Sequence, residues 1–328
     1  MIPGRRQGPL PYLERHWSAI LRDLSARDRE PRWYPHTSED MAEVGRDSID
    51  LLVTSPPYPM IARWDPLFAS WSGHSLDEFR QRSDAFELAH LCLDRVWKEC
   101  RRVVRPGGIA AINVGDATRT WDGRFRCFPN HGRILQSFLR LGFEPLVPIL
   151  WKKPTNKPNA FLGSGFLPPN AYVTLDCEYI LLFRAPGRRR HPPHDPLRYA
   201  SAFSRAERDL WFSQIWTVPG SRRAGHDASF PEEIPERLVR MFSCLGDTVL
   251  DPFAGSGTTL KVATAWGRRA IGYDIGPESD PGIHPRPRDR IAVPSAESVL
   301  ERIRRRYADA VGEGRGPRVT EALKARDS

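Results

Sequence analysis

The stretch TSPPYP, residues 54–59, brings a hydroxyl, prolines and an aromatic ring directly after the apolar run LLV. Proline lacks a backbone N–H and has a fixed φ, so the chain must leave a strand here as a stiff extended segment that holds Ser55 and Tyr58. A turn with one hydroxyl, carbonyls outside a sheet ladder and one aromatic face suits a flat ligand such as a base. A capped strand end with a packed tyrosine is the alternative, and four residues do not decide between them.

A second stretch, VLDPFAGSGTT at residues 249–259, joins an apolar run to two glycines. Gly255 and Gly257 let backbone N–H groups approach a ligand closely at the start of a helix. A P-loop needs a lysine where Thr258 stands, and a dinucleotide-binding loop needs a third glycine where Leu260 stands. We therefore expect a cofactor loop of neither phosphate-binding kind.

Two carboxylates beside this loop indicate the class of cofactor. Asp251 ends the strand before the loop, and Asp274 ends the next strand about twenty residues later, where a carboxylate can accept hydrogen bonds from ribose hydroxyls. Carboxylates without a phosphate-binding lysine suit a cofactor that has an amine and a ribose but no pyrophosphate. S-adenosylmethionine fits this description. The alternative is a helix cap and a strand-end aspartate without a ligand.

The elements that must position these residues alternate between strand and helix patterns. This alternation predicts an α/β fold with a doubly wound, mostly parallel, Rossmann-like sheet. The loop over residues 154–170 is too long for an ordinary connection and is expected to be functional. Strands are expected at 47–55, 108–116, 144–153 and 177–186, then around the glycine loop at 247–275; helices are expected at 12–27, 75–104 (one or two, ended by RPGG), 130–143 and 230–246.

This pattern divides the chain into parts. At residues 187–215 basic, aromatic and proline residues mix, and we expect this segment to recognise the target. The expected parts are an N-terminal helical extension (1–45), a catalytic half (46–186), the target-recognition segment (187–215), a cofactor-binding half (216–295), and a basic C-terminal helix and tail (296–328).

The composition favours a soluble, cytoplasmic protein with a polyanionic partner. The chain has 328 residues, a net charge of +9 and 49 Lys and Arg residues. An arginine guanidinium can donate two hydrogen bonds to one phosphate, and this binding releases counterions from the polyanion. A GC-rich genome would also give an arginine- and proline-rich chain. No apolar run approaches the roughly 20 residues that span a bilayer, and the first residues lack the apolar core of a signal peptide.

Neither the cysteines nor the histidines predict a metal site. The cysteines are odd in number, lie far apart and form no Cys-x-x-Cys pair, so we expect reduced thiols. The two histidines of HPPH, residues 191–194, cannot share a helical face and have no Cys or acidic cluster beside them. The cysteines are Cys92, Cys100, Cys127, Cys177 and Cys244.

Together, TSPPY upstream and DPFAGSGTT downstream resemble the amino-methylating DNA methyltransferases, the N4-cytosine and N6-adenine family, in the beta-type arrangement where the catalytic motif comes first. The same likeness extends to RVVRPGGIAAINVGD, ILWKKP, CEYILLFR, WTVPG and HDASFPEEIPERLV, so it covers roughly residues 46–276. The resemblance implies a Rossmann-like methyltransferase fold, S-adenosyl-L-methionine as cofactor and double-stranded DNA as partner.

The resemblance also implies residue roles. The catalytic loop would be Ser55, Pro56, Pro57 and Tyr58. The cofactor site would be lined by Asp251, Phe253, Gly255, Gly257, Thr258 and Asp274, with His226, Phe230 and Pro231 closing over its methionine end. Asp116 would be a neighbour of the site.

These roles predict methyl transfer to the exocyclic amino group of a base flipped out of the duplex. Ser55 Oγ and the Pro56 carbonyl would accept hydrogen bonds from the amino group, and Tyr58 would stack on the base. In the family, serine at the position of Ser55 usually accompanies N4-cytosine, so we expect N4-methylcytosine. No cysteine follows a proline, which excludes cytosine C5 chemistry. Plausible holders of the opened DNA are Trp211, Phe212 and Trp216.

Several alternatives stay open. An N6-adenine DNA methyltransferase of the same family stays open, although Asp or Asn usually stands at the position of Ser55 in such enzymes, and an RNA methyltransferase can share the fold and a similar loop. A non-catalytic nucleic-acid-binding module would retain the fold alone. We expect a role in restriction-modification, while a homodimer, a cognate endonuclease and the target sequence are not readable from these residues.

Overall fold

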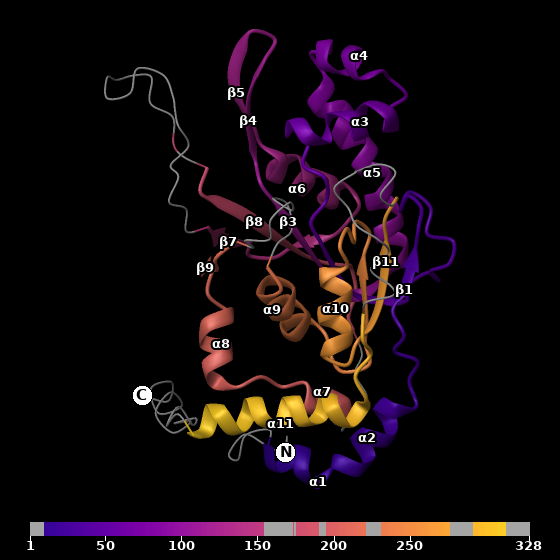
Figure 1. Cartoon of the computed structure of the whole chain (residues 1–328), viewed down its shortest axis with the longest axis vertical. Helices are drawn as coiled ribbons and strands as arrows, with labels where there is room; N and C mark the ends of the chain where they lie inside the picture. Colours follow the sequence, from indigo (N-terminus) through magenta and orange to yellow (C-terminus); the bar gives the residue numbers. More distant parts are fainter. Residues whose placement is uncertain are drawn as a thin grey trace.

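The structure is a computed structural model that describes residues 10–153, 173, 175–189, 195–220, 231–275 and 291–312. In this part of the chain, helices cover both faces of a nine-stranded sheet of order β1-β11-β10-β2-β3-β8-β7-β9, with β6 beside β8 (Figure 1). The strands from β1 to β3 run parallel, β8 runs antiparallel to β3, β6 and β7, and β9 runs parallel to β7. The strands are β1 (Arg32–Tyr34), β2 (Ile49–Thr54), β3 (Val104–Val114), β6 (Glu144–Pro145), β7 (Ile149–Lys152), β8 (Cys177–Arg184), β9 (Ile215–Thr217), β10 (Thr248–Asp251) and β11 (Arg269–Tyr273).

The central strand β2 packs into two separate hydrophobic cores. Leu51 and Val53 belong to one core and Leu52 to the other, because consecutive side chains of a strand point to opposite faces. The predicted doubly wound, mostly parallel α/β sheet is therefore confirmed. The first core takes in α9 (Glu233–Phe242) and α10 (Thr258–Ala265), and the second takes in α5 (Ala85–Val103) and α6 (Asn130–Arg140).

The parallel strands β2, β3, β10 and β11 end at one edge of the sheet, which we call the carboxyl edge. Above it in Figure 1 rise the short helices and a hairpin that follows β3. Arg119 of the hairpin donates to both carboxylate oxygens of Asp65, each over 2.8 Å. These elements are a 3-10 turn (Ala62–Trp64), α3 (Asp65–Trp71), α4 (Leu76–Gln81), β4 (Ala117–Trp121) and β5 (Arg124–Phe128).

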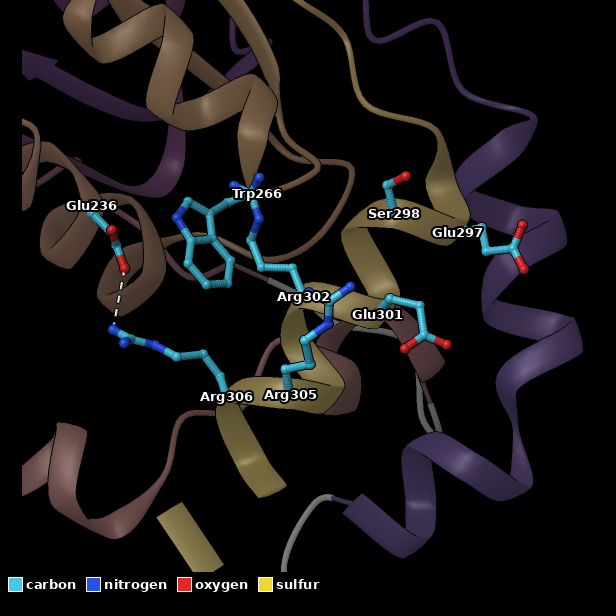
Figure 2. Close-up of a pocket in the computed structure, with 8 residues that line it drawn as sticks. All are labelled: Glu236, Trp266, Glu297, Ser298, Glu301, Arg302, Arg305 and Arg306. Carbon is cyan, nitrogen blue, oxygen red and sulfur yellow. Dashed lines mark hydrogen bonds and ion pairs between the residues drawn. The ribbon is translucent and has the colours of Figure 1, made fainter. Parts of the chain in front are cut away.

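The opposite, amino edge is covered by the two ends of the described chain (Figure 1). In Figure 2 the arginines of α11 reach toward α9 and α10: the Arg302 guanidinium lies 5.6 Å from the Trp266 ring centroid, and Arg306 Nη2 lies 3.4 Å from Glu236 Oε1. Within the expected C-terminal segment, the described residues include one helix, α11 (Ala296–Gly312). The elements here are α1 (Leu10–Arg15), α2 (Trp17–Ser25), α7 (Pro196–Ala200), α8 (Arg205–Trp211) and α11 (Ala296–Gly312).

Several predicted boundaries change in the structure. The capping box of Ser75 and Glu78 is present, and the helical stretch after it is two helices, α4 and α5. RPGG does not follow the helix as a loop, because β3 already begins at Val104. The strand expected at 144–153 is interrupted between β6 and β7. The N-terminal part is helical only to Ser25, and β1 then adds an edge strand to the sheet. The β4–β5 hairpin was not predicted.

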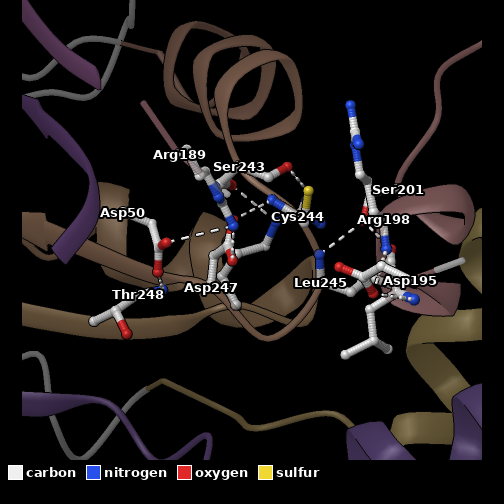
Figure 3. Close-up of polar contacts among 12 residues, drawn as sticks. Asp50, Arg189, Asp195, Arg198, Ser201, Ser243, Cys244, Leu245, Asp247 and Thr248 are labelled. Carbon is white, nitrogen blue, oxygen red and sulfur yellow. Dashed lines mark hydrogen bonds and ion pairs between the residues drawn. The ribbon is translucent and has the colours of Figure 1, made fainter. Parts of the chain in front are cut away.

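The described part of residues 187–215 attaches to the amino edge. Figure 3 shows Arg189 between Asp247 and Asp50: its Nη2 lies 2.5 Å from Asp247 Oδ1 and 3.4 Å from Asp50 Oδ1. Ser201 Oγ accepts a hydrogen bond from the Leu245 N–H over 2.7 Å. The expectation that residues 187–215 recognise the target stays a prediction.

The aromatic residues near this segment divide by exposure. Trp211 is 3% exposed and Trp216 is 1% exposed, whereas Phe212 is 54% exposed. The Trp216 indole N–H donates to the carbonyl of Trp211 over 2.9 Å. Burial in the core contradicts the suggestion that Trp211 and Trp216 hold the opened DNA, and Phe212 is the exposed residue of the three. The chain pattern alone could not separate these neighbouring aromatics.

Candidate functional site

The two sequence motifs, which lie almost 200 positions apart, meet at the carboxyl edge. Thr54 at the end of β2 donates from Oγ1 to Asp251 Oδ1 at the end of β10, over 2.6 Å, across a sequence separation of 197. The strands are direct neighbours, with Leu51 and Leu52 in register with Val249 and Leu250. Ser55 therefore follows immediately after the residue that binds the start of the glycine loop.

Asp251 is almost completely buried. It is 2% exposed, and its Oδ1 also accepts a hydrogen bond from the Phe253 N–H over 3.1 Å. Burial raises the pKa of this carboxyl group to about 6, against an opposing effect of the hydrogen bond from Thr54. A carboxylate held at such cost beside a predicted cofactor loop is typical of functional sites.

The glycine loop has the form that its sequence predicts. Gly255 and Gly257 adopt φ values of +50° and +79°, which disfavour residues with a Cβ, and α10 begins directly after Gly257. The Gly255 N–H donates to Asp274 Oδ2 over 3.1 Å, so the carboxylate that ends the β11 segment lies beside the loop. Thr258 is the first residue of α10, and its hydroxyl lies 3.1 Å from that of Ser256.

Phe253 anchors the loop to the core. Its ring meets Trp97 edge-on with centroids 5.7 Å apart and meets Trp71 edge-on at 6.4 Å. It is half-buried, so part of the ring faces away from this packing. The loop is held by aromatic contacts on one side and by Asp251 on the other.

The predicted cover of the cofactor site is described only at Pro231. The Pro231 carbonyl accepts a hydrogen bond from the Ile234 N–H over 3.0 Å at the start of α9. The neighbouring Glu232 carboxylate lies 2.6 Å from the ammonium of Lys261 on α10, so this end of α9 lies beside the helix that follows the glycine loop. His226 and Phe230 lie outside the described residues, and their roles stay predictions.

The hydroxyls of the TSPPY motif belong to a polar network. Ser55 Oγ lies 2.9 Å from Tyr58 Oη, and the Tyr58 hydroxyl donates to Glu178 Oε2 over 3.0 Å. Asn113 Nδ2 donates to Tyr58 Oη over 2.9 Å and to Glu178 Oε2 over 2.7 Å. Lys153 forms an ion pair with the other oxygen of Glu178. Burial and the negative charge of Glu178 raise the pKa of Tyr58 well above its ordinary value.

The sequence analysis missed Asn113, Lys153 and Glu178. They lie on β3, directly after β7 and on β8, within segments that were predicted as strands but were given no residue roles. A signal was present, because Asn113 interrupts an apolar strand and is 2% exposed. A buried polar side chain in a strand needs hydrogen-bond partners, although the sequence does not reveal which ones.

Asn130 holds the backbone at the end of the predicted catalytic loop. Its Nδ2 donates to the carbonyls of Pro59 (3.1 Å) and Gly115 (3.0 Å), and its Oδ1 lies 3.1 Å from His90 Nε2. Burial lowers the pKa of His90 to about 4, so a neutral imidazole donates from Nε2 to Asn130 at neutral pH. Pro56 and Pro57 are buried in the loop between Ser55 and Tyr58.

Asp116 lies at the same edge but is engaged elsewhere. Its carboxylate lies 2.7 Å and 2.8 Å from His131 Nδ1 and accepts the His131 backbone N–H over 3.1 Å. The His131 ring stacks on Tyr179 with centroids 3.9 Å apart. The described hydrogen bonds of Asp116 thus go to His131 on α6.

The described part of the chain supports neither a metal site nor a membrane-spanning helix. Among its residues no group of three or more His, Cys, Asp or Glu side chains could hold a metal ion. The same residues include no helix with the length and apolar character needed to cross a membrane.

Known proteins are similar to this chain over most of its length. A family model described as DNA methylase matches residues 49–279. The type II methyltransferase M.MjaI of Methanocaldococcus jannaschii is 53% identical over 261 residues, covering 74% of this chain and 86% of that protein. The type II methyltransferase M.MthZI of Methanothermobacter thermautotrophicus is 42% identical over 285 residues, covering 83% and 80%.

Two solved structures of DNA methyltransferases or methylases are also similar to this chain. A candidate DNA modification methylase of Thermus thermophilus, solved with S-adenosyl-L-methionine, is similar with a TM-score of 0.61 and 35% identity, covering 84% of this chain and 94% of that one. The PvuII DNA methyltransferase, cytosine-N4-specific, has a TM-score of 0.54 at 19% identity, covering 83% and 92%, and so supports the fold alone.

Proposed function

This chain belongs to the DNA methylase family, and from that premise we propose that it is an S-adenosylmethionine-dependent type II DNA methyltransferase that methylates N4 of a flipped cytosine. The observation that carries the proposal is the Thr54–Asp251 hydrogen bond, which joins the strand before Ser55 to the strand before the glycine loop. The target amino group would then lie at the end of β2, and the methyl donor would lie beside it at the end of the neighbouring strand β10. The proposal includes double-stranded DNA as substrate and a restriction endonuclease with the same target.

The residues around the glycine loop suit the chemistry of the methyl donor. Its ribose hydroxyls need a carboxylate, and Asp274 lies beside Gly255 at the end of the strand after the loop. Its amino group needs an acceptor, for which Asp251, or a carbonyl held by it, is our assignment. The ring of Phe253 would face the sulfonium end, where aromatic faces attract cations. The bound donor supplies an activated methyl group.

The residues of the TSPPY motif would make the target amino group reactive. An exocyclic amino group is a weak nucleophile because its lone pair is delocalised into the ring. Ser55 Oγ and the Pro56 carbonyl accept its two N–H groups, which localises the lone pair on nitrogen, and positioning supplies most of the remaining acceleration. No covalent enzyme intermediate is required. Ser55 is also the residue that favours cytosine over adenine.

The experiment is to incubate the protein with labelled S-adenosylmethionine and mixed-sequence duplex DNA, or RNA, and to identify the methylated nucleoside by mass spectrometry. We expect N4-methylcytosine in DNA. N6-methyladenine would keep the enzyme class and overturn the base assignment, and label in RNA alone would overturn the substrate.

Variants test the assigned loop. Ser55→Ala and Tyr58→Ala should keep cofactor binding and lose most methyl transfer, by about 10²-fold or more. Ser298→Ala, at an exposed position on α11 at the amino edge, is the matched control and should behave as the parent protein. Normal turnover in both loop variants would contradict the catalytic assignment.

A further inference from the structure

We propose that Glu178, acting through the hydroxyl of Tyr58, orients the hydroxyl of Ser55 so that its oxygen faces the target base as an acceptor. This inference rests on the proposed role of Ser55. Glu178 lies on β8, 120 positions from Tyr58 in sequence, and is outside both motifs. It would be a positioning residue, because it acts on the base only through Tyr58 and Ser55.

The direction of the hydrogen bonds follows from the groups that can donate. A carboxylate only accepts, and Glu178 Oε2 lies 3.0 Å from Tyr58 Oη and 2.7 Å from Asn113 Nδ2. Asn113 must turn its Nδ2 toward this pair, because its Oδ1 would repel the carboxylate. Nδ2 also donates to Tyr58 Oη over 2.9 Å. Tyr58 therefore accepts from Asn113 and gives its one proton to Glu178.

Ser55 is left with one compatible direction. Its Oγ lies 2.9 Å from Tyr58 Oη, and either oxygen could donate if the pair were alone. Hydrogen bonds to an ionised group are roughly twice as strong as neutral ones, so the Tyr58 proton stays with Glu178. Ser55 must then donate to Tyr58. Its lone pairs remain for an incoming N–H group, as the proposed chemistry requires.

The surroundings keep the network in this state. Burial and the charge of Glu178 raise the pKa of Tyr58 well above its ordinary value, so the phenol keeps its proton at neutral pH. Lys153 pairs with the second oxygen of Glu178 and holds the carboxylate from the other side. At Gly115 the side chain is absent where an added Cβ would lie 3.2 Å from both Tyr58 Cε2 and Glu178 Cγ. The sequence thus leaves room for Tyr58 and Glu178 to meet.

The test compares two replacements of Glu178 in single-turnover methyl transfer, with enzyme in excess over duplex DNA. Glu178→Met removes both acceptor oxygens, so the Tyr58 proton turns to Ser55 and blocks its lone pair. We expect the rate to fall on the order of tenfold to a hundredfold with unchanged S-adenosylmethionine affinity. Glu178→Gln keeps one acceptor oxygen and should recover part of the rate, which a space-filling role would not explain. Glu144→Met, at an exposed position on β6, is the matched control.

A double-mutant cycle separates positioning from general disruption. Tyr58→Phe removes the hydroxyl through which Glu178 acts, so Glu178→Met should change the rate by less than about threefold in that background. Equal losses in both backgrounds would overturn the inference, as would equal rates for the Met and Gln variants. If Glu178→Met does not fold, Tyr58→Phe is the test. A parental rate of methyl transfer in Tyr58→Phe would overturn the inference, because Glu178 acts on Ser55 only through the Tyr58 hydroxyl. A parental rate in Ser55→Ala would instead refute the proposed function.

Discussion

Replacing Asp251 with asparagine should stabilise the protein at neutral pH while weakening the binding of S-adenosylmethionine. Asp251 is 2% exposed, and burial raises its pKa to about 6 from an ordinary value of 3.8. Ionising it in the folded state is therefore unfavourable. Asparagine has the same shape, and its Oδ1 can still accept from Thr54 and from the Phe253 N–H. Because asparagine is uncharged, the folded protein no longer has to bury an ionised carboxylate at neutral pH.

The sign and size follow from proton linkage. Because the folded pKa lies above the unfolded one, the folded protein binds the proton more tightly, and stability falls as the pH rises from about 4 to about 7. A shift from 3.8 to about 6 corresponds to about 3 kcal/mol in total at about 1.4 kcal/mol per unit. About half of this, roughly 1 to 2 kcal/mol, is lost between pH 5 and pH 8. At about 2.1 cal/mol/K per residue, the unfolding entropy of a 328-residue chain is about 0.7 kcal/mol/K, so this loss corresponds to about 2–3 °C in Tm.

The assay is thermal unfolding of the parent protein and of Asp251→Asn from pH 5 to pH 8, without S-adenosylmethionine. The difference in Tm between the two proteins isolates Asp251, because every other titrating group is shared. We expect the Tm of the variant to rise by about 2–3 °C relative to that of the parent between pH 5 and pH 8. A Tm difference that is the same at both pH values would refute the reasoning. Calorimetry at pH 8 should then find weaker cofactor binding by the variant.

Three further outcomes are expected. Asp274→Ala should weaken S-adenosylmethionine binding by about tenfold or more in calorimetry, because it loses charge-assisted bonds to the ribose, and unchanged affinity would remove Asp274 from that role. Gly115→Ala puts a Cβ 3.2 Å from the Tyr58 ring, so single-turnover methyl transfer should fall while cofactor affinity holds; an unchanged rate would contradict the tight contact. Arg124 lies at the exposed tip of the hairpin above the carboxyl edge. Arg124→Ala should make the fall of log DNA affinity with log salt concentration less steep, by about 1 in the slope. Arg304→Ala on α11, beyond the amino edge, should leave that slope unchanged, and equal effects of the two would argue against DNA on the carboxyl edge.

Sequence reasoning succeeded where the determinants are local. The prolines after Thr54 end a strand wherever that strand lies, and Gly255 and Gly257 permit the positive φ values that the loop before α10 requires. The alternation of strand and helix patterns was enough to predict the doubly wound sheet. Resemblance to a family then connected the two motifs before any distance was known.

Tertiary structure decided which distant residues meet. Glu178 lies on β8, Asn113 on β3 and Lys153 directly after β7, and only the sheet order brings them into one network with Tyr58. The same order buries Trp211 and attaches Arg189 to the amino edge, far from Ser55 in the fold. By itself, then, the sequence determined the turns, the periodicities and the chemical character of the two loops, because these depend on neighbouring residues. Burial and hydrogen-bond partners across the sheet depend on strand order and register, which no local pattern encodes.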